Sequence, residues 1–255
     1  YLMFFSKKFK SFDNINHCFF SKNGGVSQGI YNSLNCGLGS NDKKVNILKN
    51  LDIVSQKMGL DNKNLFTMNQ THGNKVVVVD NSNKHIKKIN SDALVTRQKN
   101  IAISVLTADC VPVLIYDEIN QIIGSIHAGW RGAFNGIIEN TLNEFFKINR
   151  NVKINVAIGP CIAVNNYEVG QEFFSKFIHK SKSNEKFFLP FKKNKFLFDL
   201  REYVNSKFKK FEINHLENIN FDTFSENKNF FSFRRSKQAK EKDYGRCISI
   251  ISLIE

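Results

Sequence analysis

The sequence predicts an α+β protein: a single layered domain over residues 1–255 with a large mixed sheet. Three observations support this fold class. Apolar runs of strand length outnumber segments with helical periodicity. The helical segments are interspersed among the strands. None of the three Pro lies in a Pro-, Ser- or Gly-rich hinge. The polar stretch 180–186 is the one weak candidate for a domain boundary.

The first elements are short aromatic strands and a glycine-rich loop at 23–29, all within the first 40 residues. Asp42 is typical of a helix N-cap. The apolar stripe after it predicts a helix that ends near residue 59, with a core face of Val45, Leu48, Leu51 and Met58. Four consecutive valines then predict a buried strand over 75–80.

The rest of the chain alternates strands with helices. Strands are predicted at 101–106, 111–116, 121–127, 154–158 and 247–254, and helices from 129 and over 170–179 and 200–209. The helix that begins at Gly129 should turn one face to the core: Phe134, Ile137, Ile138, Leu142 and Phe145 or Phe146.

Composition excludes several classes of protein. With 42% hydrophobic and 24% charged residues the chain is globular, and no apolar run reaches the roughly 18 residues of a membrane helix. The net charge of +14 hints at a polyanion. However, the basic residues are scattered, and the abundant Lys, Asn and Phe have A- and T-rich codons. We therefore expect neither a nucleic-acid nor a membrane partner.

Cysteine usage predicts a cytoplasmic location. Five Cys are an odd number, and none forms a CxxC pair, which is typical of free thiols in a reducing compartment. The apolar start, residues 1–5, is too short for the core of a signal peptide.

Three residues at predicted strand ends could carry chemistry: His72, Cys110 and His127. Cys110 and His127 are 17 residues apart, a length that suits a hairpin returning beside its start. Two His and one Cys form a plausible zinc set with an open fourth position, and zinc held in this way lowers the pKa of its bound water.

Two other interpretations of these residues remain open. Cys110 and His127 could form a nucleophile–base pair, with Asp109 or His72 orienting the base. Alternatively, Cys110 is a buried small hydrophobe and the two His are hydrogen-bonded loop residues, which the residue chemistry alone favours.

Arginines provide candidate anion sites. Arg131 opens a predicted helix, where it could hold phosphate or simply cap carbonyls. Arg234 and Arg235 follow an aromatic run whose alternation would send them to opposite faces of a strand. The Gly24–Gly25 loop could approach a ligand or be a plain turn. The remaining His and Cys look ordinary: His17, His85, His179, His215, Cys18, Cys36, Cys161 and Cys247.

Taken together, these motifs are familiar. The chain resembles the YfiH/YlmD family, also called the laccase-domain or multicopper polyphenol oxidoreductase family, over nearly its whole length. The blocks that carry the resemblance are Gly24-Gly25-Val26-Ser27, Tyr31-Asn32-Ser33-Leu34-Asn35, Gln70-Thr71-His72-Gly73, Asp92-Ala93-Leu94-Val95-Thr96, Thr107-Ala108-Asp109-Cys110-Val111-Pro112, His127-Ala128-Gly129-Trp130-Arg131-Gly132, Ile158-Gly159-Pro160-Cys161, Tyr167-Glu168-Val169-Gly170, Phe198-Asp199-Leu200, Phe231-Ser232-Phe233-Arg234-Arg235 and Gly245-Arg246.

The resemblance implies a zinc site at His72, Cys110 and His127. It also implies a transferase and hydrolase activity: phosphorolysis of purine nucleosides (adenosine, inosine, guanosine and methylthioadenosine) and deamination of adenosine. Older labels of the family are copper-dependent polyphenol oxidase, an oxidoreductase, and an editing factor for peptidoglycan precursors. The implied fold is a layered α+β structure related to cytotoxic necrotizing factor, a Cys/His hydrolase.

Two departures from the family pattern affect the interpretation. Lys22 stands where members commonly have Arg, and Asp222 stands where many have Cys. The second change removes a soft ligand that extra copper ions would need, so we rank oxidation below nucleoside chemistry. We expect Asp109 to handle protons or support the metal ligands, and Arg131 to bind phosphate with help from Lys22, Arg234 or Arg235.

Overall fold

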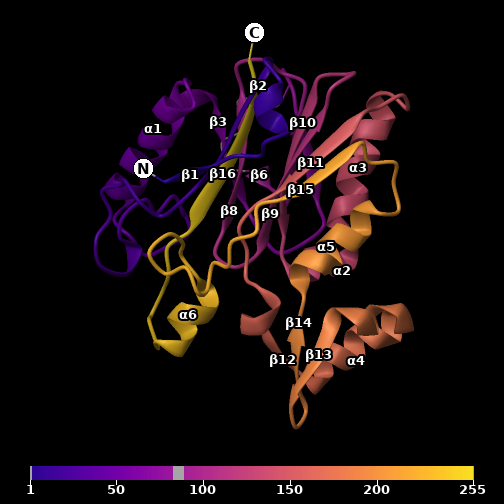
Figure 1. The fold of residues 1–255 in the computed structure, drawn as a ribbon. Helices are drawn as coiled ribbons and strands as arrows, with labels where there is room; N and C mark the ends of the chain where they lie inside the picture. Colours follow the sequence, from indigo (N-terminus) through magenta and orange to yellow (C-terminus); the bar gives the residue numbers. More distant parts are fainter. Residues whose placement is uncertain (1, 83–88, 255) are drawn as a thin grey trace.

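The structure is a computed structural model that describes residues 2–82 and 89–254. His85 therefore lies outside the described residues. Two large sheets form the centre of the molecule (Figure 1). The first has five strands in the order β1 (Met3–Phe4), β2 (Ile15–Phe20), β16 (Cys247–Leu253), β8 (Ala102–Thr107) and β3 (Leu65–Phe66). The second has six, in the order β15 (His215–Asn218), β11 (Ile154–Ile158), β9 (Val111–Asp117), β10 (Ile122–Ala128), β7 (Ala93–Thr96) and β5 (Val76–Val79).

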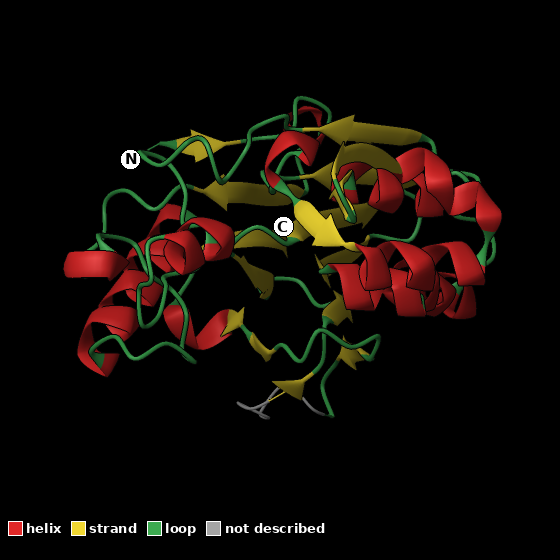
Figure 2. Ribbon diagram, turned by 90° about the horizontal axis from the view of Figure 1, so that it is seen from below, coloured by secondary structure: helices red, strands yellow, loops and turns green. Residues whose placement is uncertain are grey.

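The two sheets pack face to face, with helices on both outer sides, and Figure 2 shows the strands between the helices. Ile103 and Ile251 of the first sheet meet Leu114 and Ile123 of the second in one apolar cluster. Because each sheet is covered on both faces, its central strands are continuous apolar runs rather than alternating ones. The predicted α+β class with mixed sheets is confirmed.

Six α-helices among the described residues complete the layers. Helix α1 covers the outer face of the five-stranded sheet, and α3 and α5 cover that of the six-stranded sheet. Their bounds are α1 Lys44–Lys57, α2 Trp130–Asn135, α3 Ile137–Ile148, α4 Gln171–Lys180, α5 Leu200–Phe208 and α6 Phe233–Gln238.

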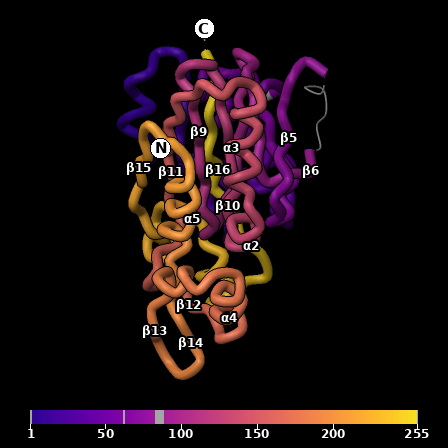
Figure 3. Tube along the Cα trace, turned by 90° about the vertical axis from the view of Figure 1, so that its right-hand side faces the viewer, coloured from indigo at the N-terminus to yellow at the C-terminus, as the bar shows by residue number. Residues whose placement is uncertain are grey.

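Two small sheets supplement the large ones. One consists of β12 (Glu168–Gly170), β14 (Lys195–Phe198) and β13 (Phe188–Lys192), and it packs with α4 through phenylalanine rings at one end of the molecule (Figure 3). The other pairs β4 (Met68–Asn69) with β6 (Ile89–Asn90). The predicted boundary stretch 180–186 overlaps a 3-10 helix, Lys182–Phe187, that follows α4.

The helix predicted from Asp42 exists, but its start and core face differ. It begins at Lys44, while the Asp42 carboxylate binds Ser27, Asn35 and the Lys43 amide. Its buried residues are Ile47, Asn50, Leu51, Val54 and Ser55, whereas Val45 and Leu48 are exposed. Leu51 and Met58 are buried as predicted. The buried face differs from the predicted one because Asn50 turns inward, where its side chain accepts the Val26 amide of the glycine-rich loop and donates to the Asn35 carbonyl beyond it.

Three other predictions need correction. The valine strand β5 is the edge of its sheet, so only Val79 is fully buried. The predicted single helix from Gly129 is two helices, because Gly136 adopts a positive φ of 93° between them. Arg234 and Arg235 lie in the first turn of α6 rather than on a strand, since the Ser232 hydroxyl accepts the Arg235 amide and starts a helix there.

Candidate active site

The predicted hairpin brings Cys110 beside His127. Strands β9 and β10 are antiparallel neighbours, with Val111 opposite Ala128 and Pro112 opposite His127. Cys110 precedes β9 by one residue and so lies at the end of the hairpin where His127 sits. His72 reaches the same place from the loop after β4, with a positive φ of 59°.

The three side chains form one cluster of donor atoms. A ring nitrogen of each His and the Cys110 sulfur all lie within 4.8 Å of one another. His127 is buried, Cys110 is half-buried and His72 is exposed, so the cluster opens to solvent on the His72 side. The two imidazole rings are nearly perpendicular, with centroids 4.7 Å apart.

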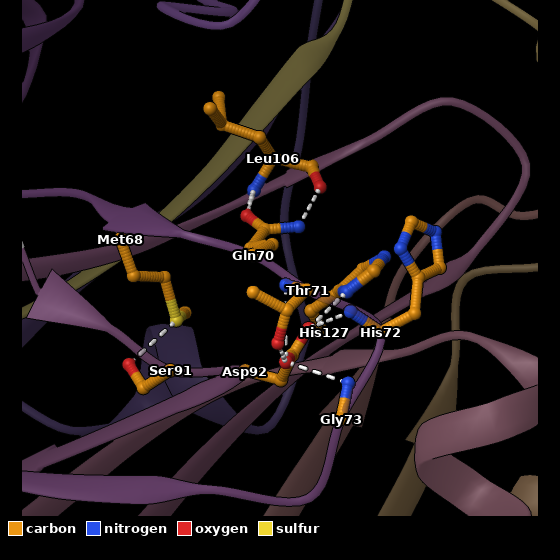
Figure 4. A network of polar contacts seen from close by, with 9 residues as sticks. All are labelled: Met68, Gln70, Thr71, His72, Gly73, Ser91, Asp92, Leu106 and His127. Atoms are coloured by element: carbon orange, nitrogen blue, oxygen red, sulfur yellow. Dashed lines mark hydrogen bonds and ion pairs between the residues drawn. The ribbon is translucent and has the colours of Figure 1, made fainter.

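A buried carboxylate, Asp92, organises this cluster (Figure 4). One oxygen lies 2.8 Å from Nδ1 of His127 and also accepts the His72 amide at 2.9 Å. The other oxygen accepts the Gly73 amide at 2.8 Å, together with the amide and hydroxyl of Thr71. Because Asp92 engages Nδ1 of His127, the Nε2 atom is left for the cluster.

The electrostatics favour a thiolate at Cys110. Burial raises the pKa of this thiol, but the charge and hydrogen bonds of His127 and His72 outweigh burial and lower it. Burial lowers the pKa of His127, yet the Cys110 thiolate and Asp92 together raise it. The pKa of the Asp92 carboxyl is below its usual range, because the His127 imidazole and the amides of Gly73 and Thr71 outweigh its burial. Thiolate sulfur is the form that acts as a nucleophile or a metal ligand.

The cluster fits a metal ion in chemistry and in space. One thiolate and two imidazoles suit zinc, with a further coordination position open to substrate or water. Gly129 keeps the space beside them clear, since a Cβ there would lie 3.0 Å from the Cys110 sulfur and 3.1 Å from Cδ2 of His72. Among residues 2–82 and 89–254, this cluster is the one group of at least three candidate ligands.

Asp109 directs its carboxylate to the start of α6 and to the segment before it. Its carboxylate is buried and accepts the Thr223 hydroxyl at 2.7 Å, the Ser232 hydroxyl at 2.9 Å and the Arg234 amide at 2.7 Å. Burial raises the pKa of this carboxyl, and these three donors oppose the rise. Both oxygens are thus occupied by structural partners.

Two of the four predicted anion ligands, Arg234 in α6 and Arg131 in α2, lie over aromatic rings. The Arg234 guanidinium lies 5.2 Å from the Tyr167 ring centroid and donates to the Glu168 carbonyl at 2.9 Å. Arg131 is exposed in α2, with its guanidinium 5.1 Å from the Trp130 ring. The charges of Cys110, Arg234 and Arg131 all act on the Tyr167 phenol, although burial has the largest effect and raises its pKa.

The other two predicted anion ligands, Lys22 and Arg235, contact the segment before α6. Arg235 directs its guanidinium to the carbonyls of Thr223, Phe224 and Phe230. Lys22 lies over the Phe231 ring, with its amine 5.7 Å from the centroid. Burial and the Arg235 charge lower the pKa of Lys22. Arg235 therefore holds the loop before α6 together.

Sequence reasoning missed Asp92 and Tyr167 as site residues. Both stand in motifs that carry the family resemblance, but neither has a chemical partner nearby in the sequence. Asp92 meets His127 because β7 and β10 are neighbours, with Ala93 opposite Ile126. The remaining thiols, Cys18, Cys36, Cys161 and Cys247, are free and buried.

The fold and the cluster together define the class of protein. Two mixed sheets pack between helices, and a His–Cys–His candidate metal site lies at the end of the β9–β10 hairpin. The chain belongs to the family described as multi-copper polyphenol oxidoreductase laccase, whose model matches residues 16–254. This confirms the resemblance inferred from the motifs.

Relatives and solved structures agree with this assignment. A Rickettsia conorii protein named purine nucleoside phosphorylase is 35% identical over 204 residues, or 78% of this chain and 84% of the relative. One from Rickettsia prowazekii with the same name is 31% identical over 230 residues, or 89% and 86%. The crystal structure of Bacillus licheniformis YfiH superposes with a TM-score of 0.89 at 26% identity, covering 98% of this chain and 96% of YfiH. A Neisseria meningitidis protein gives a TM-score of 0.84 at 31% identity, covering 95% and 96%.

In the part of the chain that is described, every helix is too short or too polar to cross a bilayer.

Proposed function

We propose that this chain is a zinc-dependent purine nucleoside enzyme. It would cleave adenosine, inosine, guanosine and methylthioadenosine with phosphate, and deaminate adenosine. The observation that carries the proposal is the His72–Cys110–His127 cluster, with Arg131 four residues after His127 in the chain and the Arg234 amide bonded to Asp109, the residue before Cys110. The names of the Rickettsia relatives support it.

The metal site would consist of His72, Cys110 and His127. Zinc supplies Lewis acidity there, which polarises an oxygen or activates water. The single cluster favours one zinc over a set of coppers, because the described residues assemble no second group of three candidate ligands. Asp92 orients His127 and fixes the loop that carries His72.

In phosphorolysis, a phosphate oxygen forms a new bond to C1′ of the ribose. The bond from C1′ to the purine nitrogen breaks, and the purine leaves with its electron pair. The attacking dianion needs a cationic cradle, and we assign it to Arg131 and Arg234. The Arg234 guanidinium lies over the Tyr167 ring and that of Arg131 lies over the Trp130 ring, and the planar fork of a guanidinium matches the oxygens of a phosphate. In deamination, water adds at C6, the bond from C6 to the amine breaks and ammonia leaves, so this reaction needs no anion.

The test is metal analysis paired with product analysis. Purified protein should contain about one zinc per chain, and His72→Ala, Cys110→Ala and His127→Ala should each lose it. Adenosine with phosphate should give adenine and ribose 1-phosphate, and adenosine alone should give inosine and ammonia. Several coppers per chain with oxygen consumption on phenols would instead support the copper-dependent polyphenol oxidase.

One observation favours a second candidate, a Cys/His amidohydrolase acting on peptidoglycan precursors. Cys110, His127 and Asp92 are arranged as a nucleophile, a base and a carboxylate that orients the base. The orienting residue is Asp92, not Asp109 or His72. In this alternative the thiolate attacks an amide carbon directly. Chelation would then leave catalysis intact, whereas alkylation of Cys110 would abolish it.

A further inference from the structure

Asp109 connects the loop that carries Cys110 to the start of α6. It directly precedes Cys110 and adopts a φ of 87°, a conformation that non-glycine residues rarely take. Its side chain is only 7% exposed and accepts three hydrogen bonds from segments more than 100 residues later in the chain. A buried carboxylate with these partners fixes the separation of the segments that it joins.

Two of these donors set the position of the helix that carries Arg234. The Ser232 hydroxyl binds Asp109 and also accepts the Arg235 amide at 3.1 Å, so it caps α6. The Arg234 amide binds the same Asp109 oxygen. Since the main chain of Arg234 is held in this way, its guanidinium reaches the Glu168 carbonyl and the Tyr167 ring.

We propose that Asp109 is a positioning residue that holds Arg234 at a fixed place relative to Cys110. Its effect on the reaction passes through the anion-binding guanidinium and involves no proton transfer. This inference rests on the proposed function, in which Arg234 binds phosphate. It replaces the expected proton-handling role, because both oxygens of Asp109 already accept hydrogen bonds.

The chemistry of an amide side chain provides the decisive variant. In Asp109→Asn, the amide oxygen can still accept from Ser232 and Arg234, while the NH₂ donates to the Thr223 hydroxyl, which can also act as an acceptor. The hydrogen bonds that join Asp109 to Thr223, Ser232 and Arg234 are kept, but an ionisable group is lost. Asp109→Ala removes all three hydrogen bonds.

We therefore expect Asp109→Ala to weaken phosphate binding about tenfold, as for the loss of a well-placed hydrogen-bonded contact. Asp109→Asn should recover most of that affinity. The readouts are the Kd of inorganic phosphate by calorimetry and the KM for phosphate, with zinc content measured alongside. If both variants keep wild-type phosphate affinity and lose about 100-fold in kcat, Asp109 handles protons and the proposal is wrong.

A double-mutant cycle tests the route through Arg234. If Asp109 acts through Arg234, then Asp109→Ala should add little to the phosphate Kd of Arg234→Ala. Asp222→Ala is the matched control, because Asp222 also accepts main-chain amides, but from Ala163 and Phe224, which lie outside α6. Its effect should be additive with that of Arg234→Ala. Additive effects of Asp109→Ala would overturn the proposal.

Two further results separate this inference from the proposed function. Wild-type protein that binds phosphate without cleaving nucleosides would refute the function, while the cycle in Kd would still test the positioning. Wild-type protein that does not bind phosphate would refute both. If Asp109→Ala fails to fold, Asp109→Asn alone tests the proposal. A phosphate Kd and a kcat both near the wild-type values support positioning, whereas an unchanged Kd with a kcat about 100-fold lower refutes it.

Discussion

The carboxylate of Asp92 binds both histidines of the donor cluster, lying 2.8 Å from Nδ1 of His127 and 2.9 Å from the main-chain nitrogen of His72. His72 has a positive φ, so its loop needs an external acceptor to hold its amides. One buried side chain therefore sets the ring orientation of one candidate ligand and the backbone of the other.

Replacing Asp92 by Asn should weaken zinc binding about 10–100-fold, which is typical for partners of metal-binding histidines. The amide presents only one acceptor oxygen, so His127 Nδ1 and the amides of His72 and Gly73 can no longer all be satisfied. Competition with a chromophoric chelator measures the affinity. Thr71→Val is the graded control, because it removes only the hydroxyl donor to Asp92 and leaves His127 bound. Equal losses in both variants would contradict this account.

Arg131→Lys should impair phosphorolysis about tenfold or more and impair deamination less. Lysine keeps the charge but loses the planar fork that matches a phosphate, and only phosphorolysis needs the anion. Product ratios from adenosine at fixed phosphate measure this difference. Arg150, exposed beyond the end of α3, provides the control as Arg150→Lys. An equal loss of both activities in Arg131→Lys would assign Arg131 a structural role.

Gly129→Ala should reduce metal affinity while leaving stability nearly unchanged. Gly129 has a φ of −70° and a ψ of 163°, which alanine adopts without strain. The new methyl would crowd the Cys110 sulfur and His72, so we expect about tenfold weaker zinc binding. Gly39→Ala is the matched control, since a Cβ there meets no atom within 4 Å. Metal titration and thermal unfolding of both variants check the prediction, and unchanged zinc affinity in Gly129→Ala would contradict it.

The local part of this site could be predicted from the sequence. The apolar runs around Cys110 and His127 defined a hairpin, and the hairpin register brings the two residues together. His72 belonged with them because its residue type completes a zinc set. Strands buried on both faces, such as β8, β9 and β11, could also be predicted, because each is a largely apolar run in the sequence.

What the sequence did not predict depends on tertiary contacts. Asp92 and His127 meet through the pairing of two strands that lie far apart in the chain, and no local pattern records that pairing. Arg234 looked like a strand residue because Phe231 and Phe233 alternate with polar neighbours. The helix cap by Ser232, reinforced by Asp109, overrides that pattern. The core face of α1 was predicted wrongly for a similar reason. Asn50 is buried in the structure, whereas a prediction from hydrophobic periodicity assigns polar residues to the exposed face.

His17 should make the fold sensitive to acid. It is buried on β2, and its Nε2 accepts the Ser6 amide at 2.8 Å. Burial, with a smaller contribution from the Lys10 charge and against the opposing Glu217 charge, lowers the pKa of His17 to about 4. A lowered histidine pKa means that the unfolded chain takes up a proton first. The contribution of neutral His17 to the free energy of unfolding is fully present above about pH 6.5 and declines as the pH falls toward 4. It amounts to at most roughly 3 kcal/mol.

His17→Gln removes this titration and should flatten the decline. Urea unfolding of the variant and the wild type near pH 7 and pH 4.5 measures it, and the difference between the two proteins cancels the carboxylates that they share. The variant should be less stable at pH 7, because it loses ring contacts with Phe5 and Phe9. The same change in stability with pH in both proteins would show that His17 does not titrate on unfolding.

Reactivity of Cys110 distinguishes the two candidate functions at a single atom. If its sulfur is bound to zinc, a thiol reagent should label it slowly in zinc-loaded protein and at least about tenfold faster after chelation. Cys18 and Cys36 are buried, with pKa values raised mainly by burial, so they provide an internal control that should stay unlabelled in both states. Restoring zinc before labelling should restore both protection and adenosine turnover. Rapid labelling in metal-replete protein, with turnover of an amide substrate that survives chelation, would instead make Cys110 the nucleophile, His127 its base and Asp92 the residue that orients the base.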